Sequence, residues 1–163
     1  MDDLLIRRVN RGSWNKWARK VMHTMRATLP KEAGLESKDI RWILANTRYI
    51  MLVATCGENF VGFTIGFFHN FDDEPEIAAI GDKHIFHLCI NVIAQEFQGR
   101  GLGTKFLRDR IAFARHAGAK TCTSYGREGV SLHNLKKVGG KVIGIRENFQ
   151  GSGEKFSIVR VDI

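Results

Sequence analysis

The chain has 163 residues, enough for one domain with a hydrophobic core and too few for two domains of ordinary size. Hydrophobic residues make up 44% and charged residues 26%, with two prolines, which is typical of a soluble globular protein and excludes a disordered chain. No apolar run is long enough to span a membrane, and the acidic start differs from a signal peptide. We therefore expect a single cytoplasmic domain over residues 1–163.

The formal net charge of +8 fits three kinds of partner: nucleic acid, an anionic membrane surface or a polyanionic small molecule. The basic residues are scattered along the chain, as on a solvated surface, so nucleic-acid binding is not expected as the main role. Cys56, Cys89 and Cys122 form no Cys-x-x-Cys pair, so we expect reduced residues that fill the core, and no metal site.

The N-terminal half of the chain predicts a strand, two helices and two further strands. Apolar residues at three- and four-residue intervals indicate the helices, and runs rich in β-branched and aromatic residues indicate the strands. Ser13 and Ser37 are the expected helix-capping residues. The expected elements are a strand over 4–9, helices over 14–29 and 37–46, strands over 49–55 and 59–71, an acidic loop over 72–76, and a segment 77–82 that extends one strand or the next.

The centre of the chain joins a strand to a helix through a glycine-rich turn without a linker. Residues 85–93 predict a strand with a buried middle, and residues 102–117 place apolar side chains on one helical face. A turn at this place directs the backbone N–H groups of the helix N-terminus at whatever binds above it. Those donors and the helix dipole favour an anion, typically a phosphate.

Three known glycine-loop motifs differ in the residue spacing that they require. A Walker loop needs Gly-Lys followed by Ser or Thr, which Gly103-Thr104-Lys105 does not supply. A dinucleotide fingerprint needs glycine where Thr104 stands and an acid about twenty residues later, and residues 120–124 contain none. The third pattern, Gln or Arg followed by x-x-Gly-x-Gly or Ala, matches residues 98–103, Gln-Gly-Arg-Gly-Leu-Gly. With this turn the chain resembles the GNAT superfamily of acyl-CoA-dependent N-acyltransferases.

The rest of the chain extends the resemblance over essentially its whole length. A strand over 120–124, a helix over 130–138 and strands over 141–148 and 155–161 complete the expected order. That order, strand, two helices, three strands, helix, strand, helix, two strands, is the one expected of the GNAT fold. The resemblance implies an α/β (α+β) protein with a central mixed, mostly antiparallel sheet of about seven strands flanked by about four helices.

The resemblance also implies that acetyl-CoA (coenzyme A) is the cofactor. Its pyrophosphate would be held by backbone N–H groups of the turn, where glycine lets the phosphates approach closely. Main-chain groups of Ile90, Asn91 and Val92 would hold the pantetheine arm and polarise the thioester, where this strand splays from residues 120–124. The side chains of Ile90 and Val92 are expected in the core. The expected residues of the turn are Gln98, Gly99, Arg100, Gly101, Leu102 and Gly103, with the Leu102 side chain in the core.

Two residues are candidates for catalysis. Strand alternation places His87 on the less apolar face of its strand. An imidazole there could accept the amine proton, directly or through water. The alternative for His87, and also for His84, is an ordinary hydrogen-bonded histidine. The tyrosine that many family members use as the acid falls on Leu135. Tyr125 is therefore the candidate acid, with a structural tyrosine as the alternative, and a thiol can also leave unaided.

The expected function is an N-acetyltransferase that transfers the acetyl group from acetyl-CoA to a primary amine by direct attack on the thioester. The acceptor, a small-molecule or peptide amine, would enter beside residues 29–37 and 71–76. The second range contains Asp72, Asp73, Glu74 and Glu76, which either attract a cationic amine or belong to an ordinary solvated loop. The alternative is a non-catalytic or weakly catalytic acyl-CoA-binding sensor or interaction module of the same fold. Exposed closing strands would suit a homodimer.

Overall fold

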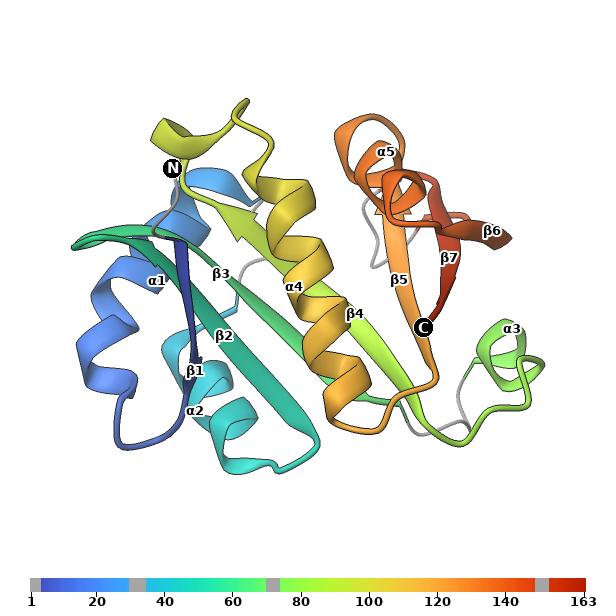
Figure 1. Ribbon diagram of the computed structural model, residues 1–163, viewed down its shortest axis with the longest axis horizontal. Helices are drawn as coiled ribbons and strands as arrows, with labels where there is room; N and C mark the ends of the chain where they lie inside the picture. The colour runs from blue at the N-terminus through green and yellow to red at the C-terminus, as the bar shows by residue number, and fades with distance from the viewer. Residues whose placement is uncertain (1–3, 30–34, 70–73, 149–152) are drawn as a thin grey trace. The chain divides into compact units, whose positions relative to one another are not determined.

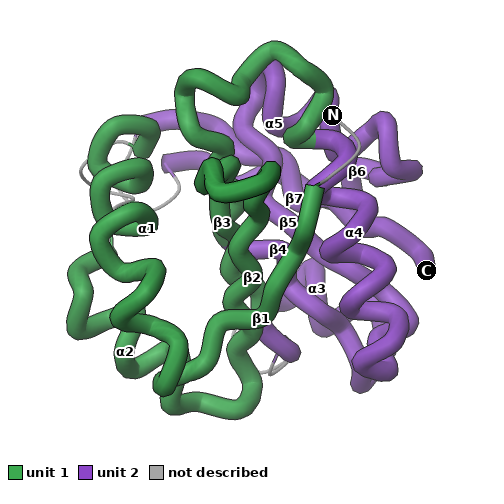
Figure 2. Tube along the Cα trace, turned by 60° about the vertical axis from the view of Figure 1, so that its left-hand side comes forward, with its two compact units in different colours: residues 1–66, 90–103 green, residues 67–89, 104–163 purple. Residues whose placement is uncertain are grey.

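The computed structural model describes residues 4–29, 35–69, 74–148 and 153–163. Hydrogen bonds link seven strands in the order β1-β2-β3-β4-β5-β7-β6. The chain divides into two compact units, residues 1–66 with 90–103 and residues 67–89 with 104–163, which Figure 2 colours separately. The seven-stranded mixed sheet confirms the expected fold class, and the single domain over residues 1–163 stays a prediction.

The helices and strands follow the predicted order with one addition, a short helix after β3. The structure therefore has five α-helices in its described residues where about four were expected, plus one 3₁₀ turn. The elements, drawn in Figure 1, are β1 (Leu4–Val9), α1 (Trp14–Thr28), α2 (Ser37–Ala45), β2 (Tyr49–Cys56), β3 (Asn59–Phe68), α3 (Pro75–Ala78), β4 (Ile85–Ile93), η3 (Gln95–Phe97), α4 (Leu102–His116), β5 (Thr121–Arg127), α5 (Val130–Lys137), β6 (Lys141–Arg146) and β7 (Phe156–Asp162).

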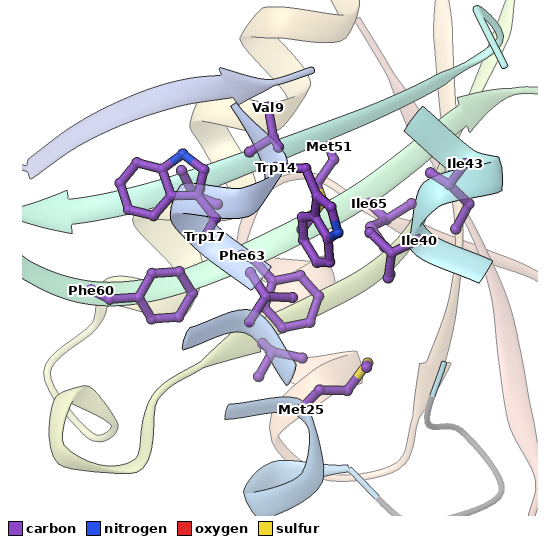
Figure 3. Packing of buried hydrophobic residues seen from close by; sticks show 13 residues of the cluster. Val9, Trp14, Trp17, Met25, Ile40, Ile43, Met51, Phe60, Phe63 and Ile65 are labelled. Carbon is purple, nitrogen blue, oxygen red and sulfur yellow. The ribbon is translucent and has the colours of Figure 1, made fainter. Parts of the chain in front are cut away.

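In unit 1, helices α1 and α2 bury their apolar faces against strands β1 to β3. Trp14 and Trp17 stand three positions apart on α1, so both rings lie on one helical face, and both are buried. Figure 3 shows them packed with Ile40 of α2 and with strand side chains. The Trp17 and Phe60 ring centroids are 6.3 Å apart. This cluster holds the helices on the sheet because it removes large apolar side chains from water.

The beginnings of α1 and α2 agree with the capping prediction in part. Ser13 occupies the N-cap position of α1 as predicted, but its hydroxyl bonds to the backbone of Asn10 and makes no capping hydrogen bond to the helix. The N-cap of α2 is Glu36, and Ser37 is the first helical residue. Glu36 and Asp39 form a capping box in which the Asp39 carboxylate accepts the Glu36 N–H at 2.7 Å. A carboxylate satisfies the free N–H groups here, so the serine is not needed.

Strands β3 and β4 approach each other closely within unit 1. A Cβ added at Gly62 would lie 2.2 Å from the carbonyl oxygen of Val92, far inside van der Waals contact. Glycine is the residue that allows this approach. Val92 itself is buried, as predicted for its side chain.

In unit 2, strand β5 pairs antiparallel with β7 from Thr121↔Asp162 to Arg127↔Phe156, and β6 continues the sheet beyond β7. Residues 77–82, expected to extend one strand or the next, contain the second half of helix α3 and no strand. Pro75 occupies the first helical turn, where its missing N–H is harmless, and the turn places Ile77 in the core with Ile85 and Ile158. The expected strand 59–71 ends at Phe68, and the expected strand 141–148 ends at Arg146.

In the described part of the chain, no helix is long and apolar enough to cross a membrane.

Candidate active site

The glycine-rich turn in unit 1 is fixed by its own hydrogen bonds. The Gln98 side chain donates from Nε2 to the carbonyl oxygen of Ile93 at 2.9 Å, and the Gln98 backbone N–H donates to Gln95 at 3.2 Å. Gly99 and Gly101 both have φ of 74°, a conformation that other residues rarely adopt, and a Cβ at either would point into open space. The glutamine therefore braces the turn, and the two glycines leave its outer side uncovered.

Helix α4 begins directly after this turn at Leu102. The Leu102 side chain is 5% exposed, which confirms its predicted place in the core. The first N–H groups of any α-helix, here those of Leu102 and Gly103, have no acceptor within the helix. Arg100 is exposed and stacks over the Phe97 ring with 5.7 Å between its guanidinium carbon and the ring centroid. Backbone donors, the helix dipole and a nearby cation together fit an anion such as a pyrophosphate.

The backbone of β4 before the turn is partly engaged. The Thr64 hydroxyl donates to the carbonyl oxygen of Ile90 at 2.5 Å, and Ile90 packs against the unit 1 core. Asn91 is exposed and Val92 is buried, so alternate side chains point to opposite faces here. The core positions of Ile90 and Val92 agree with the prediction for their side chains, while the pantetheine role of their backbone stays a prediction.

The parallel ladder between β4 and β5 in unit 2 is short. It pairs Ile85–His87 with Thr121–Thr123, and β5 then continues for four more residues. At the next position the Ser124 hydroxyl donates to the Leu88 carbonyl oxygen at 2.9 Å, where a backbone N–H would donate in a regular ladder. Side-chain bonding therefore follows the last backbone pair of this ladder, and the predicted splaying at Ile90–Val92 stays a prediction.

Tyr125 lies on β5 with its ring in an apolar cluster and its hydroxyl at the edge of that cluster. The ring packs against Ile77, Ile85 and Ile158, and the hydroxyl donates to Oε2 of Glu74. Burial and the Glu74 carboxylate raise the pKa of the Tyr125 phenol above its usual value of 10, and Arg146 acts in the opposite direction. The phenol is therefore protonated at neutral pH, the state a general acid requires.

Carboxylates and cations extend this network in unit 2. Glu74 directs its second oxygen, Oε1, towards His69, whose Nε2 is 3.9 Å away. Arg146 on β6 pairs with Glu76 at 3.0 Å. Both glutamates are partly exposed and have partners, so the described half of the predicted acidic segment is not simply a solvated loop. Asp72 and Asp73 lie outside the described residues.

His87 is buried, although alternation was predicted to place it on the less apolar face of its strand. It is 4% exposed because β4 is covered on both faces near its start. Its Nδ1 lies 3.0 Å from the Thr123 hydroxyl, and its ring is 5.1 Å from Phe67 and 5.2 Å from Tyr125. Burial, with smaller contributions from His69 and Arg110, lowers the pKa of His87 from 6.5 to about 3. The imidazole is therefore neutral at physiological pH and a weak base.

A buried arginine on α4 contributes to the charge around His87. Arg110 is 3% exposed, and burial lowers the pKa of its guanidinium to about 10, so the group stays charged at neutral pH. Cys122 is also buried, and burial raises the pKa of its thiol to about 12. Cys89 is exposed, which corrects the expectation that all three cysteines fill the core. The odd-numbered positions of β4 change from buried to exposed after His87, so alternation alone did not place Cys89.

Other candidates lie apart from the network. His84 is exposed before β4, and its N–H donates to Asp82. Leu135 on α5 is 4% exposed and packs against Gly126 and Gly140, so it is a core residue. In the described ranges, no group of three or more His, Cys, Asp or Glu side chains could hold a metal ion.

Sequence reasoning did not identify His69, Thr123, Arg110 or Arg146. The acidic character of residues 72–76 was a signal for Glu74, but nothing local pairs Glu74 with Tyr125, 51 positions away. The contact depends on α3, which the sequence pattern did not predict.

Comparison with solved structures supports the fold. Ard1 from Thermoplasma volcanium is 13% identical, with 99% of this chain and 98% of that chain covered and a TM-score of 0.77. The ribosomal-protein-S18-alanine N-acetyltransferase from Escherichia coli is 16% identical, with 98% and 94% covered and a TM-score of 0.73. A GNAT family acetyltransferase from Elizabethkingia anophelis, solved with acetyl-CoA bound, is 16% identical, with 100% of both chains covered and a TM-score of 0.71.

A search of curated proteins found no match to this chain. The model of the acetyltransferase (GNAT) family matches residues 14–139, most of the chain and all of the glycine-rich turn. Together with the strand-turn-helix geometry, this match shows that the chain belongs to the GNAT acetyltransferase family.

Proposed function

We propose that the protein is an N-acetyltransferase that binds acetyl-CoA and transfers its acetyl group to a primary amine by direct attack on the thioester. The observation that carries the proposal is the turn before α4. Its two left-handed glycines and its open outer side leave room for a pyrophosphate above the N-terminus of the helix. The acetyl-CoA in the Elizabethkingia anophelis protein supports the choice of cofactor, since the two chains share the fold.

In this proposal the turn residues Gln98 to Gly103 have separate roles. Gln98 holds the turn through Ile93, Gly99 and Gly101 provide the conformation, and Arg100 adds a positive charge. The N–H groups of Leu102 and Gly103 donate to the pyrophosphate. Main-chain groups of Ile90, Asn91 and Val92 bind the pantetheine arm.

Tyr125 is the proposed acid that protonates the departing thiolate. Its phenol is protonated at neutral pH, and its ring is held by the apolar cluster around Ile158. His87 is proposed to support the Tyr125 ring as a neutral imidazole, since a group whose pKa is about 3 accepts few protons near pH 7. This assignment replaces the initial hypothesis that His87 is the base.

Calorimetric titration of acetyl-CoA tests the cofactor site. Gly101→Glu places a carboxylate where the phosphates are proposed to lie, and we expect it to abolish micromolar binding by charge repulsion. Gly57→Glu is the matched control: Gly57 also has positive φ, at 55°, and also faces open space, but lies in the β2–β3 hairpin. Unchanged affinity in Gly101→Glu, or no binding by the unaltered protein, would contradict the proposal.

The second candidate is an acyl-CoA-binding sensor or interaction module with little turnover. The observations that favour it are the core position of Leu135, where many relatives carry the acid, and the low pKa of His87. The two functions separate in one assay, which measures CoA release by the protein with acetyl-CoA and a panel of small-molecule and peptide amines. Tight binding without amine-dependent CoA release would select the sensor.

We also propose a cytoplasmic location and a homodimer formed through β6. This strand lies at one end of the strand order and exposes three apolar side chains: Val142, Ile143 and Ile145. An exposed apolar edge strand readily pairs with a second strand.

A further inference from the structure

The exposed face of helix α1 carries positive charges and no negative one. The helix contains no aspartate or glutamate and lies along the outside of unit 1 (Figure 2). Its exposed residues are Asn15, Lys16, Arg19, Lys20, His23, Arg26 and Ala27. Intervals of three and four residues place them on one side of the helix. Although basic residues are scattered along the sequence, α1 thus brings four of them together, and we call Lys16, Arg19, Lys20 and Arg26 the α1 stripe.

Carboxylates of the protein do not neutralise the α1 stripe. In the described part of the chain none of its four cations forms an ion pair, and Lys16 lies over the Trp17 ring, with 5.1 Å between Nζ and the ring centroid. Helix α2 differs, because its Lys38 pairs with Glu36 at 2.9 Å. Like charges three and four positions apart on a helix repel each other. A bound polyanion would remove this repulsion.

The two faces of α1 indicate which polyanion fits. Trp14, Trp17, Val21 and Met25 are buried in the unit 1 core, so the helix has no apolar face free to enter a lipid surface. The exposed face has no apolar side chain larger than that of Ala27. Protein interfaces are anchored by large aromatic side chains and are depleted in lysine. Phosphate groups of a nucleic acid need no such anchor, because Lys and Arg bind them directly.

The length of the stripe suits a regular backbone. Lys16 and Arg26 are ten positions apart, which corresponds to about 15 Å along a helix. Phosphates of one strand of a duplex follow each other every 3.4 Å or so, and the stripe therefore spans about four nucleotides. Single-strand binders stack bases on aromatic side chains, and the exposed face of α1 has no Trp, Tyr or Phe. We propose that the α1 stripe binds the phosphate backbone of a nucleic-acid duplex.

This surface goes beyond the proposed acetyl transfer and does not depend on it. The stripe contains none of the residues assigned to acetyl-CoA, and it reads no base, so binding is independent of nucleotide sequence. It serves as an accessory surface that holds the protein at a nucleic acid. The phosphate backbone is common to DNA and RNA, and the two are compared as separate probes.

Fluorescence anisotropy with labelled DNA and RNA duplexes of about 20 base pairs tests the proposal. The test variant combines three substitutions in the stripe: Arg19→Gln, Lys20→Gln and Arg26→Gln. The matched control combines three at exposed cations of unit 2: Arg108→Gln, Arg115→Gln and Lys120→Gln. Each variant lowers the formal net charge of +8 by three, so the two differ only in where the charge is removed. Circular dichroism melting checks that both variants fold.

We expect the Kd for the duplexes to rise at least about tenfold in the test variant and far less in the control. The affinity should fall between about 50 and 200 mM salt, and the logarithmic slope should be shallower by roughly 2–3 in the test variant, because three phosphate contacts are lost. The Kd for acetyl-CoA should be the same in all three proteins. Tighter stripe-dependent binding of one duplex would support the proposal and identify that nucleic acid as the partner.

Four outcomes would overturn the proposal. The first is a wild-type protein that binds neither duplex at about 50 mM salt. The second is an equal loss in both variants, which would show attraction by net charge alone. The third is displacement of the duplex by saturating acetyl-CoA, which would place the duplex on the glycine-rich turn. The fourth is tighter stripe-dependent binding of polyglutamate or of phosphatidylserine vesicles at equal charge concentration, which would identify an acidic protein or a membrane as the partner.

Discussion

The burial of His87 makes the stability of the protein depend on pH in a defined way. In the unfolded chain this imidazole titrates near its ordinary pKa of 6.5, and in the folded protein burial lowers that pKa to about 3. Between these values the unfolded state binds a proton that the folded state does not. The contribution of the neutral His87 to the free energy of unfolding is therefore fully present above pH 6.5 and is lost as the pH falls towards 3.

The magnitude follows from the two pKa values. At pH 5 the unfolded histidine is almost fully protonated and the folded one almost fully neutral, which costs about 2 kcal/mol relative to neutral pH. His87→Asn removes the titration but leaves an amide that can bond to the Thr123 hydroxyl. The groups around His87, namely His69, Arg110 and Tyr125, remain in both proteins. The difference between the two pH profiles therefore isolates His87.

Urea unfolding from pH 7.5 to pH 5 measures this difference. The free energy of unfolding of the wild type should fall by about 2 kcal/mol more than that of His87→Asn over this range. In thermal unfolding the same difference corresponds to roughly 4–8 °C in Tm for a chain of this size. Parallel profiles would show that His87 is hydrated or charged in the folded protein, and the reasoning from burial would fail.

Three further predictions concern packing and assembly. Gly62→Ala should lower the free energy of unfolding by about 2–3 kcal/mol, measured by urea titration, because its Cβ would lie 2.2 Å from the Val92 carbonyl oxygen; an unchanged midpoint would contradict the close approach of β3 and β4. Leu135→Ala should cost about 2–5 kcal/mol in the same measurement, since the side chain is 4% exposed, and a smaller loss would argue against a core role. Ile145→Lys should shift the proposed homodimer to monomer in sedimentation velocity without lowering Tm, because Ile145 is 60% exposed; a protein that is monomeric before the substitution would refute the dimer.

The parts of the fold that depend on local pattern were predicted from the sequence. The strand-turn-helix at residues 85–117 is written in consecutive residues: β-branched residues, then glycines, then apolar positions at helical spacing. The left-handed φ of Gly99 and Gly101 and the burial of Leu102 agree with that pattern. Periodicity and glycine placement suffice here because the constraints act between neighbours in the chain.

Features set by contacts between distant residues were not predicted. Residues 75–78 form helix α3 because Ile77 packs beside Ile85 and Ile158, and no local sequence pattern indicates that contact. His87 is buried although its neighbours at i+2 and i+4 are exposed, since covering elements, not strand alternation, decide burial at this end of β4. Alternation specifies which side of a sheet a residue faces, and tertiary packing decides whether that side is covered.

The position of a catalytic acid also depends on contacts between residues that are distant in the sequence. A phenol can act as a general acid where its ring is held in place and its hydroxyl stays protonated. Neither condition requires one particular position in the sequence. On α5 the side chain at the expected position, Leu135, is buried beside Gly126 and Gly140 and has no ionisable proton. On β5 Tyr125 meets both conditions, because isoleucines pack against its ring and its hydroxyl donates a hydrogen bond to the Glu74 carboxylate. The loss of the tyrosine from α5 therefore argues for a relocated acid at least as strongly as for a lost activity.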